Sequence, residues 1–247
     1  MEEFLTLQFW FAVGSIILID ILLGGDNAVV IALACRKLDP SQRKKGILLG
    51  TLCAIVLRVI LIFFALKLLT IPFLKLVGAA LLLMIGIKLL LPQEHLDDGK
   101  IQSSDKLWGA VKTIAIADLV MSLDNVMAIA GAAQSAHQSH HMILVIFGLL
   151  VSIPIIIWGS QLVMKLMDRF PVIITLGGML LGWIAGTMAI GDIFVTQNVL
   201  PQTWLNIAQV SGGEPVLEPV ASIYYTCGVM GALFVLFVSL LFKKKKS

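Results

Sequence analysis

Long apolar segments constrain this chain more than any other feature of its sequence. Hydrophobic residues make up 59% of the 247 residues and charged residues only 13%. This composition lies outside the range of soluble domains. About 20 apolar residues in a helix cross the hydrocarbon core of a bilayer. The segments long enough to do so lie at approximately 8–34, 46–69, 72–91, 107–133, 142–166, 170–190 and 221–242. The sequence therefore predicts an all-α polytopic membrane protein with seven transmembrane helices.

The distribution of Lys and Arg predicts how the chain is oriented, because short cytoplasmic loops carry an excess of these residues. Basic residues fall at 36–45, 100–106, 165–169 and 243–246, whereas 1–7, 134–141 and 191–220 contain none. We expect an inner (plasma) membrane protein with its amino terminus outside and its carboxyl terminus in the cytoplasm. The net charge of +3 is then a topology signal, so no nucleic-acid partner is expected. The tail Lys243–Lys246 is interpreted as an anchor to anionic membrane lipids.

An internal repeat relates the two halves of the chain. The segment "DILLGGDNAVVIALA" aligns with "DLVMSLDNVMAIAGA", which places Asp20 on Asp118 and Asp26 on Asp124. Each copy has three helices, an odd number, so the second copy is inverted in the membrane. Inverted repeats are typical of secondary transporters, whose sites lie near the bilayer midplane between the halves. The predicted parts are a first three-helix repeat at 1–91, a cytoplasmic loop at 92–106, a second inverted three-helix repeat at 107–190, an extracytoplasmic loop at 191–220, and a seventh helix with a basic cytoplasmic tail at 221–247.

The four acids of this repeat are expensive to place in a membrane. An ionised Asp at the centre of a membrane helix costs about 2.5–3.5 kcal/mol on insertion scales. The alternative to a functional site is that the acids pair with internal bases or serve as neutral hydrogen-bonding groups between helices. Arg58 is the one base deep in an apolar segment, and its repeat counterpart is Ile156. Because one cation does not balance four carboxylates, the pattern favours a cation site.

Paired glycines interrupt the first motif. Gly24 and Gly25 can leave helical geometry and let the helix restart with Asp26 or Asn27 as its N-cap, which frees carbonyl oxygens to line a cavity or bind a ligand. Close helix packing is the alternative role of these glycines. The second copy has Ser122 in this region, whose hydroxyl adds an oxygen. The predicted metal ligands are Asp20, Asp26, Asn27, Asp118, Asp124 and Asn125, supported by Gly24, Gly25, Ser122 and Arg58.

The donor set indicates which ions this site would take. Oxygen ligands without Cys or His favour a hard divalent cation such as Mg²⁺, Ca²⁺ or Mn²⁺. Met121 and Met127 flank the second motif; a thioether ligand would favour Mn²⁺, while membrane packing is the alternative. The three cysteines share no metal or redox spacing and are interpreted as packing residues. The histidines at 137, 140 and 141 are interpreted as part of a solvated turn.

The two motifs also carry a resemblance. "DILLGGDNAVVIALACRKL" and "DLVMSLDNVMAIAGAA" resemble the TerC family of bacterial membrane proteins, over nearly the whole chain. The resemblance implies manganese efflux, protection from excess manganese and metal supply to exported enzymes. It also assigns the metal-binding role to the paired Asp and Asn residues of both motifs. Other branches of the family have Glu at Asp20 and a Ser-containing sequence at Gly24-Gly25, which leaves the ion preference open.

We therefore expect a non-enzymatic exporter of divalent metal, with Mn²⁺ as first choice, that works by alternating access. Protons are the expected counter-ion, because crowded carboxylates bind protons that an arriving metal displaces. The first alternative is a non-transporting membrane partner that supplies metal to exported proteins or to the secretion machinery. The second is an intramembrane aspartyl protease, but Leu23 replaces the first Gly of its Gly-x-Gly-Asp signature. A homo-oligomer is a further open alternative.

Overall fold

The computed structural model describes residues 14, 25–68, 71–91, 103–134, 141–208 and 216–244, with the side chains at 62, 65–68, 103, 124–134, 141–150, 208, 216 and 243–244 outside the description. The described chain is mostly helical, as expected. A helix over Gly25–Cys35 is followed by α2 (Pro40–Leu68), α3 (Leu74–Leu90), α4 (Ser103–Gln134), α5 (His141–Arg169), α6 (Val172–Ile190), α7 (Ile193–Asn198) and α8 (Ala221–Lys244).

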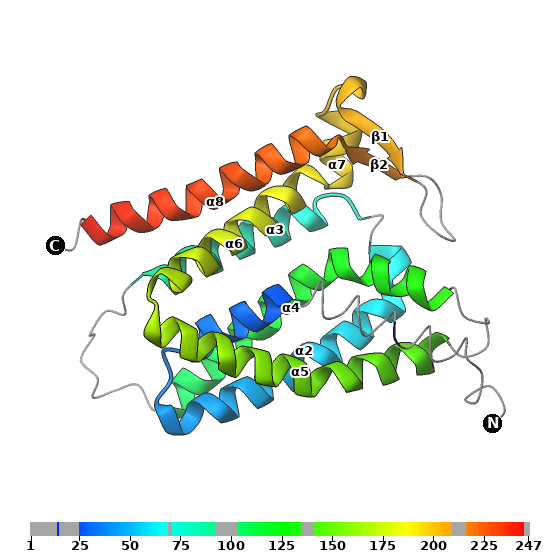
Figure 1. Cartoon of the computed structure of the whole chain (residues 1–247). Helices are drawn as coiled ribbons and strands as arrows, with labels where there is room; N and C mark the ends of the chain where they lie inside the picture. Colours follow the sequence, from blue (N-terminus) through cyan, green and yellow to red (C-terminus); the bar gives the residue numbers. More distant parts are fainter. Residues whose placement is uncertain are drawn as a thin grey trace.

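The helices form two packed groups (Figure 1). In one group α6 lies between α3 and α8, and in the other α2 packs along α4 and also contacts α5. The helix Gly25–Cys35 joins the groups, since every residue from Val30 to Cys35 is buried. It approaches α6 closely: a Cβ built on Gly177 would lie 2.9 Å from side-chain atoms of Val29 and Leu33. The described segment Gly25–Cys35 therefore lies in the middle of the apolar core.

Equivalent positions in the two predicted repeats occupy similar places. Gly78 of α3 faces Val120 of α4, and Gly177 of α6 faces Leu33 of the first described helix. In each half, the third helix thus packs against the first helix of the other half, which is the arrangement expected for an inverted repeat. The two-repeat architecture, its part boundaries and the count of seven spans nevertheless stay predictions.

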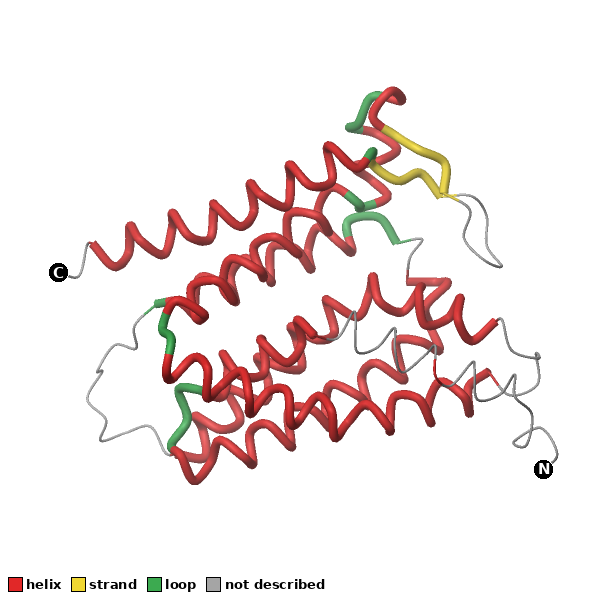
Figure 2. Tube along the Cα trace, in the orientation of Figure 1, coloured by secondary structure: helices red, strands yellow, loops and turns green. Residues whose placement is uncertain are grey.

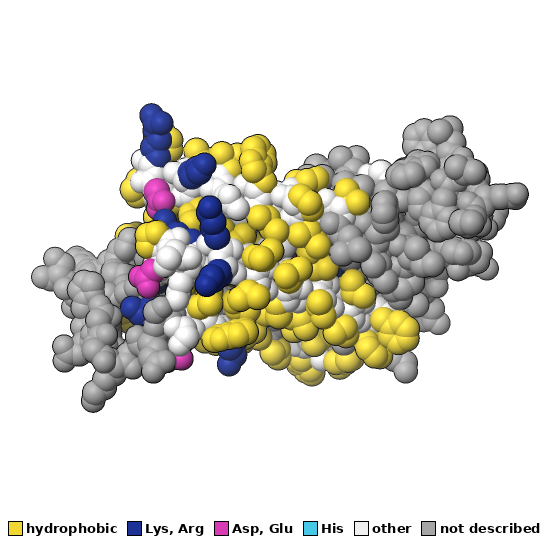
Figure 3. Space-filling model, turned by 90° about the horizontal axis from the view of Figure 1, so that it is seen from below, with side chains coloured by type: hydrophobic (Ala, Val, Ile, Leu, Met, Phe, Trp, Pro, Cys, Tyr) yellow, Lys and Arg dark blue, Asp and Glu magenta, His cyan; other side chains and the backbone are white. Residues whose placement is uncertain are grey.

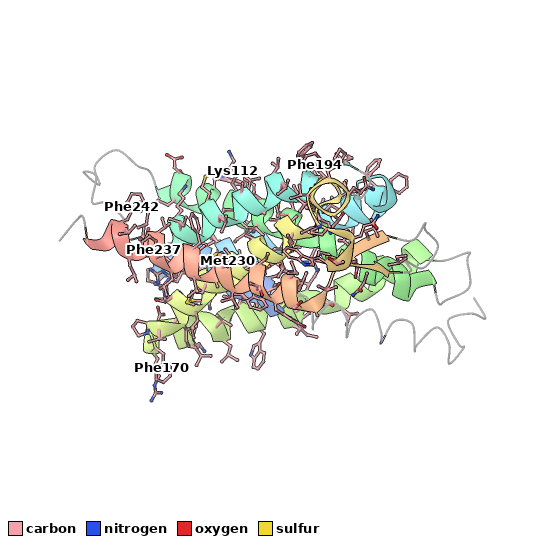
Figure 4. The ribbon with its side chains drawn as sticks, turned by 90° about the horizontal axis from the view of Figure 1, so that it is seen from above. Lys112, Phe170, Phe194, Met230, Phe237 and Phe242 are labelled. Carbon is pink, nitrogen blue, oxygen red and sulfur yellow. The ribbon has the colours of Figure 1, made fainter. Side chains whose placement is uncertain are left out.

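Three of the described helical segments are long and apolar enough to cross a membrane. They are Val151–Arg169, Val172–Ile190 and Ala221–Phe242, while the described part of the first helical segment, Gly25–Cys35, is apolar and shorter. Large apolar side chains project from α8 without covering neighbours, among them Met230 at 65% and Phe237 at 62% exposure (Figure 4). A soluble protein rarely exposes such a continuous apolar face, so this face of α8 suits contact with lipid chains.

Basic side chains gather at one end of the molecule (Figure 3). There, Arg43 of α2 pairs with Asp168 of α5 at 3.2 Å. The Lys37 ammonium donates to the carbonyls of Lys88 and Leu91 at 3.2 and 3.0 Å and so caps the end of α3. Burial, helped by the charges of Arg36 and Lys88, lowers the pKa of Lys37. The predicted basic regions 36–45 and 165–169 thus lie together, and the side of the membrane that this end faces stays a prediction.

The sequence misjudged two connections in detail. The first predicted basic loop is shorter, because α2 already begins at Pro40, where proline suits the first turn of a helix. The long connection 191–220 was expected to be a loop, but it contains α7, a 3₁₀ turn at Gln202–Trp204, and the antiparallel strands β1 (Leu205–Ala208) and β2 (Val216–Pro219). Figure 2 shows this hairpin at the end opposite the carboxyl terminus of α8.

Candidate functional site

A buried ion pair joins α2 to α4. The Arg58 Nη2 atom donates to Asp118 Oδ1 at 2.6 Å, and the two side chains are only 2% and 5% exposed. Arg58 Nε also donates to Ser122 Oγ at 3.1 Å, and that hydroxyl donates to Asp118 Oδ2 at 3.3 Å. Charge-assisted bonds of this kind are stronger than bonds between neutral groups. Arg58, Asp118 and Ser122 therefore form a closed polar triangle inside an apolar bundle.

The packing of α2 on α4 explains why these side chains meet. A Cβ built on Gly50 would lie 2.5 Å from Ile114 Cδ1, so the missing side chain lets the two helices approach. Ser122 follows Ile114 by the same eight residues that separate Arg58 from Gly50, which places Ser122 and Arg58 at similar depth. Helical side chains tilt toward the helix N-terminus, and so the long Arg58 side chain reaches back one turn to Asp118.

Asp26 brings the first motif into the same electrostatic environment. It lies in the described helical segment Gly25–Cys35, where its Oδ1 accepts the backbone N–H of Asn27 at 2.8 Å. Its carboxylate is attracted by Arg58 and repelled by Asp118. One acid from each predicted repeat thus shares the field of a single arginine. Among the described side chains, Arg58 is the only buried Lys or Arg, so one base faces two acids.

The Asn27 side chain is buried without satisfying its polar atoms. It is 3% exposed, and neither its Oδ1 nor its Nδ2 has a hydrogen-bond partner within the described part of the chain. Among the described residues, the Thr51 hydroxyl is likewise buried and has no hydrogen-bond partner. Thr51 precedes Arg58 by seven residues, so the two lie on the same face of α2. Buried polar groups are nearly always paired. Asn27 and Thr51 each offer a buried oxygen that has no hydrogen-bond partner among the described residues, and such oxygens are suited to a ligand.

Comparison with known proteins identifies the family. The sequence profile described as "Integral membrane protein TerC family" matches residues 5–247. The chain belongs to the TerC family. It is 44% identical over 211 residues to the uncharacterized membrane protein YjbE of Bacillus subtilis, covering 84% of this chain and 91% of that protein. It is 28% identical over 188 residues to YceF of the same organism, with 73% and 71% covered.

One more distant relative is much longer than this chain. The UPF0053 protein YegH of Escherichia coli is 25% identical over 194 residues, which is 71% of this chain but 36% of that protein. No solved structure matches the chain. The family match and the apolar helices together show an integral membrane protein.

The structure places part of the predicted TerC-type site and not the rest. Asp26, Asn27, Asp118, Ser122 and Arg58 belong to the described region reported above, and their proposed metal role stays a prediction. Asp20 and Gly24 lie outside the described residues, and Asp124 and Asn125 lie in α4 with side chains outside the description. Within the described residues, no group of three or more His, Cys, Asp or Glu side chains is gathered for a metal. Gly25 is exposed and has no close neighbour there, which gives no support to a packing role.

Sequence reasoning missed one buried acid, Asp192. It is 0% exposed and accepts backbone N–H groups from Phe73, Lys75, Leu76 and Phe194 at 2.9–3.3 Å. It therefore caps both α3 and α7, where the helix dipole favours a negative charge. An Asp directly before an apolar run is an N-cap signal that could have located it. Its four backbone donors indicate that it fixes the junction of α6 and α7 to α3.

Proposed function

We propose that this TerC-family protein exports divalent metal ions, with Mn²⁺ as the preferred cargo, by alternating access across the inner membrane. The observation that carries the proposal is the buried amide of Asn27, which has no hydrogen-bond partner among the described residues and lies beside Asp26, an acid within the field of the Arg58–Asp118 pair. A polar side chain without a partner is costly inside a protein, and a cation bound by its carbonyl oxygen would offset that cost.

The charge at the site supports a cation as cargo. Asp26 and Asp118 are balanced within the described residues by Arg58 alone, and Asp20 and Asp124 of the same motifs would add negative charge. Intramembrane acids that face a bundle interior mark ion pathways. Carboxylate, amide and hydroxyl oxygens are the ligands of hard divalent cations.

The preference for Mn²⁺ rests on the family resemblance rather than on a sulfur ligand. Met121 is 3% exposed and belongs to the apolar core with Ile114 and Ala117, which supports its packing role. Protons are the proposed counter-ion, bound when the metal has left by those acids of the site that are not paired with Arg58.

Purified protein in liposomes tests the proposal against a non-transporting role. Flux of Mn²⁺, Mg²⁺ and Ca²⁺ is followed by quenching or response of a trapped metal-sensitive dye. Wild-type protein should move Mn²⁺ unaided, and Asp26→Asn should abolish the flux, because the amide keeps the shape of the side chain but loses its charge. The matched control is Asp168→Asn, an exposed acid at the basic end, which should leave the flux unchanged.

Two results would count against this proposal. Wild-type protein that moves none of the three metals would favour a partner that hands metal to exported proteins. Undiminished flux in Asp26→Asn would place the transport site elsewhere in the protein.

A further inference from the structure

The guanidinium of Arg58 occupies positions on Asp118 that a transported cation would use. Asp118 Oδ1 accepts from Arg58 at 2.6 Å, and Oδ2 accepts from Ser122 at 3.3 Å. Both carboxylate oxygens are thus engaged, and the Ser122 oxygen is itself bound to Arg58 Nε. A metal that binds Asp118 therefore has to displace Arg58 from this carboxylate.

A divalent cation and a guanidinium repel each other at such short range. Charges interact strongly where the surroundings are apolar and water is scarce, and Arg58 is only 2% exposed. Arginine cannot relieve the repulsion by losing a proton, because it stays charged in proteins. Its long side chain can move, whereas Asp118 is fixed close to the backbone of α4.

We propose that Asp118 alternates between Arg58 and the transported metal, so that Arg58 acts as a tethered cation during the unloaded part of the transport cycle. This inference rests on the proposed function. Metal binding displaces the guanidinium from Asp118. Metal release lets the Arg58–Asp118 ion pair form again. A buried carboxylate without a counter-charge is strongly unfavourable, so re-pairing is what allows the unloaded protein to change its access state.

Only one of the two predicted repeats has a basic residue at this position. The repeat counterpart of Arg58 is Ile156 of α5, which is 7% exposed and packs in the apolar core. The tethered cation therefore comes from the first half and neutralises an acid of the second. Asp26 is attracted by the same arginine. When Arg58 leaves Asp118, both acids can therefore interact with the metal instead.

Two fluxes measured in the same proteoliposomes test the inference. Net efflux, with Mn²⁺ on one side only, requires the unloaded protein to return, whereas exchange of radioactive for unlabelled Mn²⁺ with metal on both sides does not. In Arg58→Gln, which keeps hydrogen-bonding groups but loses the charge, net efflux should fall about tenfold or more while exchange stays within about twofold of wild type. Arg58→Lys should recover part of the net efflux, because it restores a positive charge.

Each other outcome overturns the inference. Net efflux retained in Arg58→Gln would show that the unloaded protein returns without this cation. Loss of both net efflux and exchange would show that Arg58 is needed for folding or for metal binding itself, and equal behaviour of Lys and Gln would remove the role of charge. The control Arg43→Gln, in the exposed pair at the basic end, should alter neither flux. A wild-type protein that moves no Mn²⁺ would refute the proposed function itself, which separates the two failures.

Discussion

Removing one partner of the Arg58–Asp118 pair should destabilise the protein strongly, whereas removing both should not. The two side chains are 2% and 5% exposed and 2.6 Å apart, which places the pair among buried ion pairs. Breaking such a pair from one side costs about 3–5 kcal/mol, because the remaining charge is left uncompensated, while an apolar replacement of both is often neutral or stabilising. We therefore expect Arg58→Met and Asp118→Leu each to lower the stability of the protein strongly, and the double variant to change it little.

The structure offers a matched control for this prediction. Arg43 and Asp168 also form an ion pair, but their side chains are 28% and 57% exposed, and exposed pairs contribute about 0–1 kcal/mol. Thermal unfolding in detergent, followed by tryptophan fluorescence, measures both pairs on one scale. For a chain of this size, about 1 kcal/mol corresponds to roughly 2–4 °C in Tm. Arg58→Met should thus lower Tm by about 10 °C and Arg43→Met by no more than about 4 °C.

Two results would refute this reasoning. Equal losses of Tm in Arg58→Met and Arg43→Met would show that Arg58 is not held in a buried pair. A double variant whose loss equals the sum of its single variants would show that Arg58 and Asp118 do not interact, since residues in contact are non-additive.

Three further predictions concern packing and capping. Thr51→Val should raise the stability by about 1 kcal/mol in thermal unfolding, because it removes a buried hydroxyl without a partner among the described residues; a lower Tm would mean that the hydroxyl is paired. Asp192→Ala should lower the stability by about 2 kcal/mol or more, since four backbone donors lose their acceptor, and Asp192→Asn should lose less. Gly186→Ala should destabilise the protein, because its Cβ would lie 2.1 Å from the carbonyl oxygen of Cys227 on α8. The control Gly109→Ala, on an open face of α4, should instead stabilise it by roughly 0.5–1 kcal/mol, and equal effects of the two would contradict this packing.

Continuous apolar segments made several helices predictable. The predicted span 170–190 corresponds to α6 at Val172–Ile190, and 72–91 corresponds to α3 at Leu74–Leu90. Both segments begin beside a proline and end where the apolar run stops, so composition alone locates them. Residues 191–220 were harder, because short elements in a polar connection carry little periodic signal. The same uncertainty concealed Asp192, which follows an apolar span and was assigned to a loop.

The residue types of the buried polar cluster were predictable, but the pairing of Arg58 with Asp118 was not, and the role of these residues as a metal site stays a prediction. The cost of intramembrane acids identified Asp26 and Asp118, and the same reasoning identified Arg58 as a deep base. That Arg58 selects Asp118 depends on how α2 crosses α4, which the close contact of Gly50 with Ile114 determines. Sequence spacing within one helix contains no information on that crossing.

The measurement that tests the central claim most directly is anomalous diffraction at the manganese absorption edge from crystals grown with Mn²⁺. The account predicts one anomalous peak between Asn27 and α4, coordinated by Asp26, Asn27 and at least one acid of α4, with the Arg58 guanidinium withdrawn from Asp118. An anomalous peak only at the basic end or at the histidines of 137–141, with the Arg58–Asp118 pair intact, would contradict it.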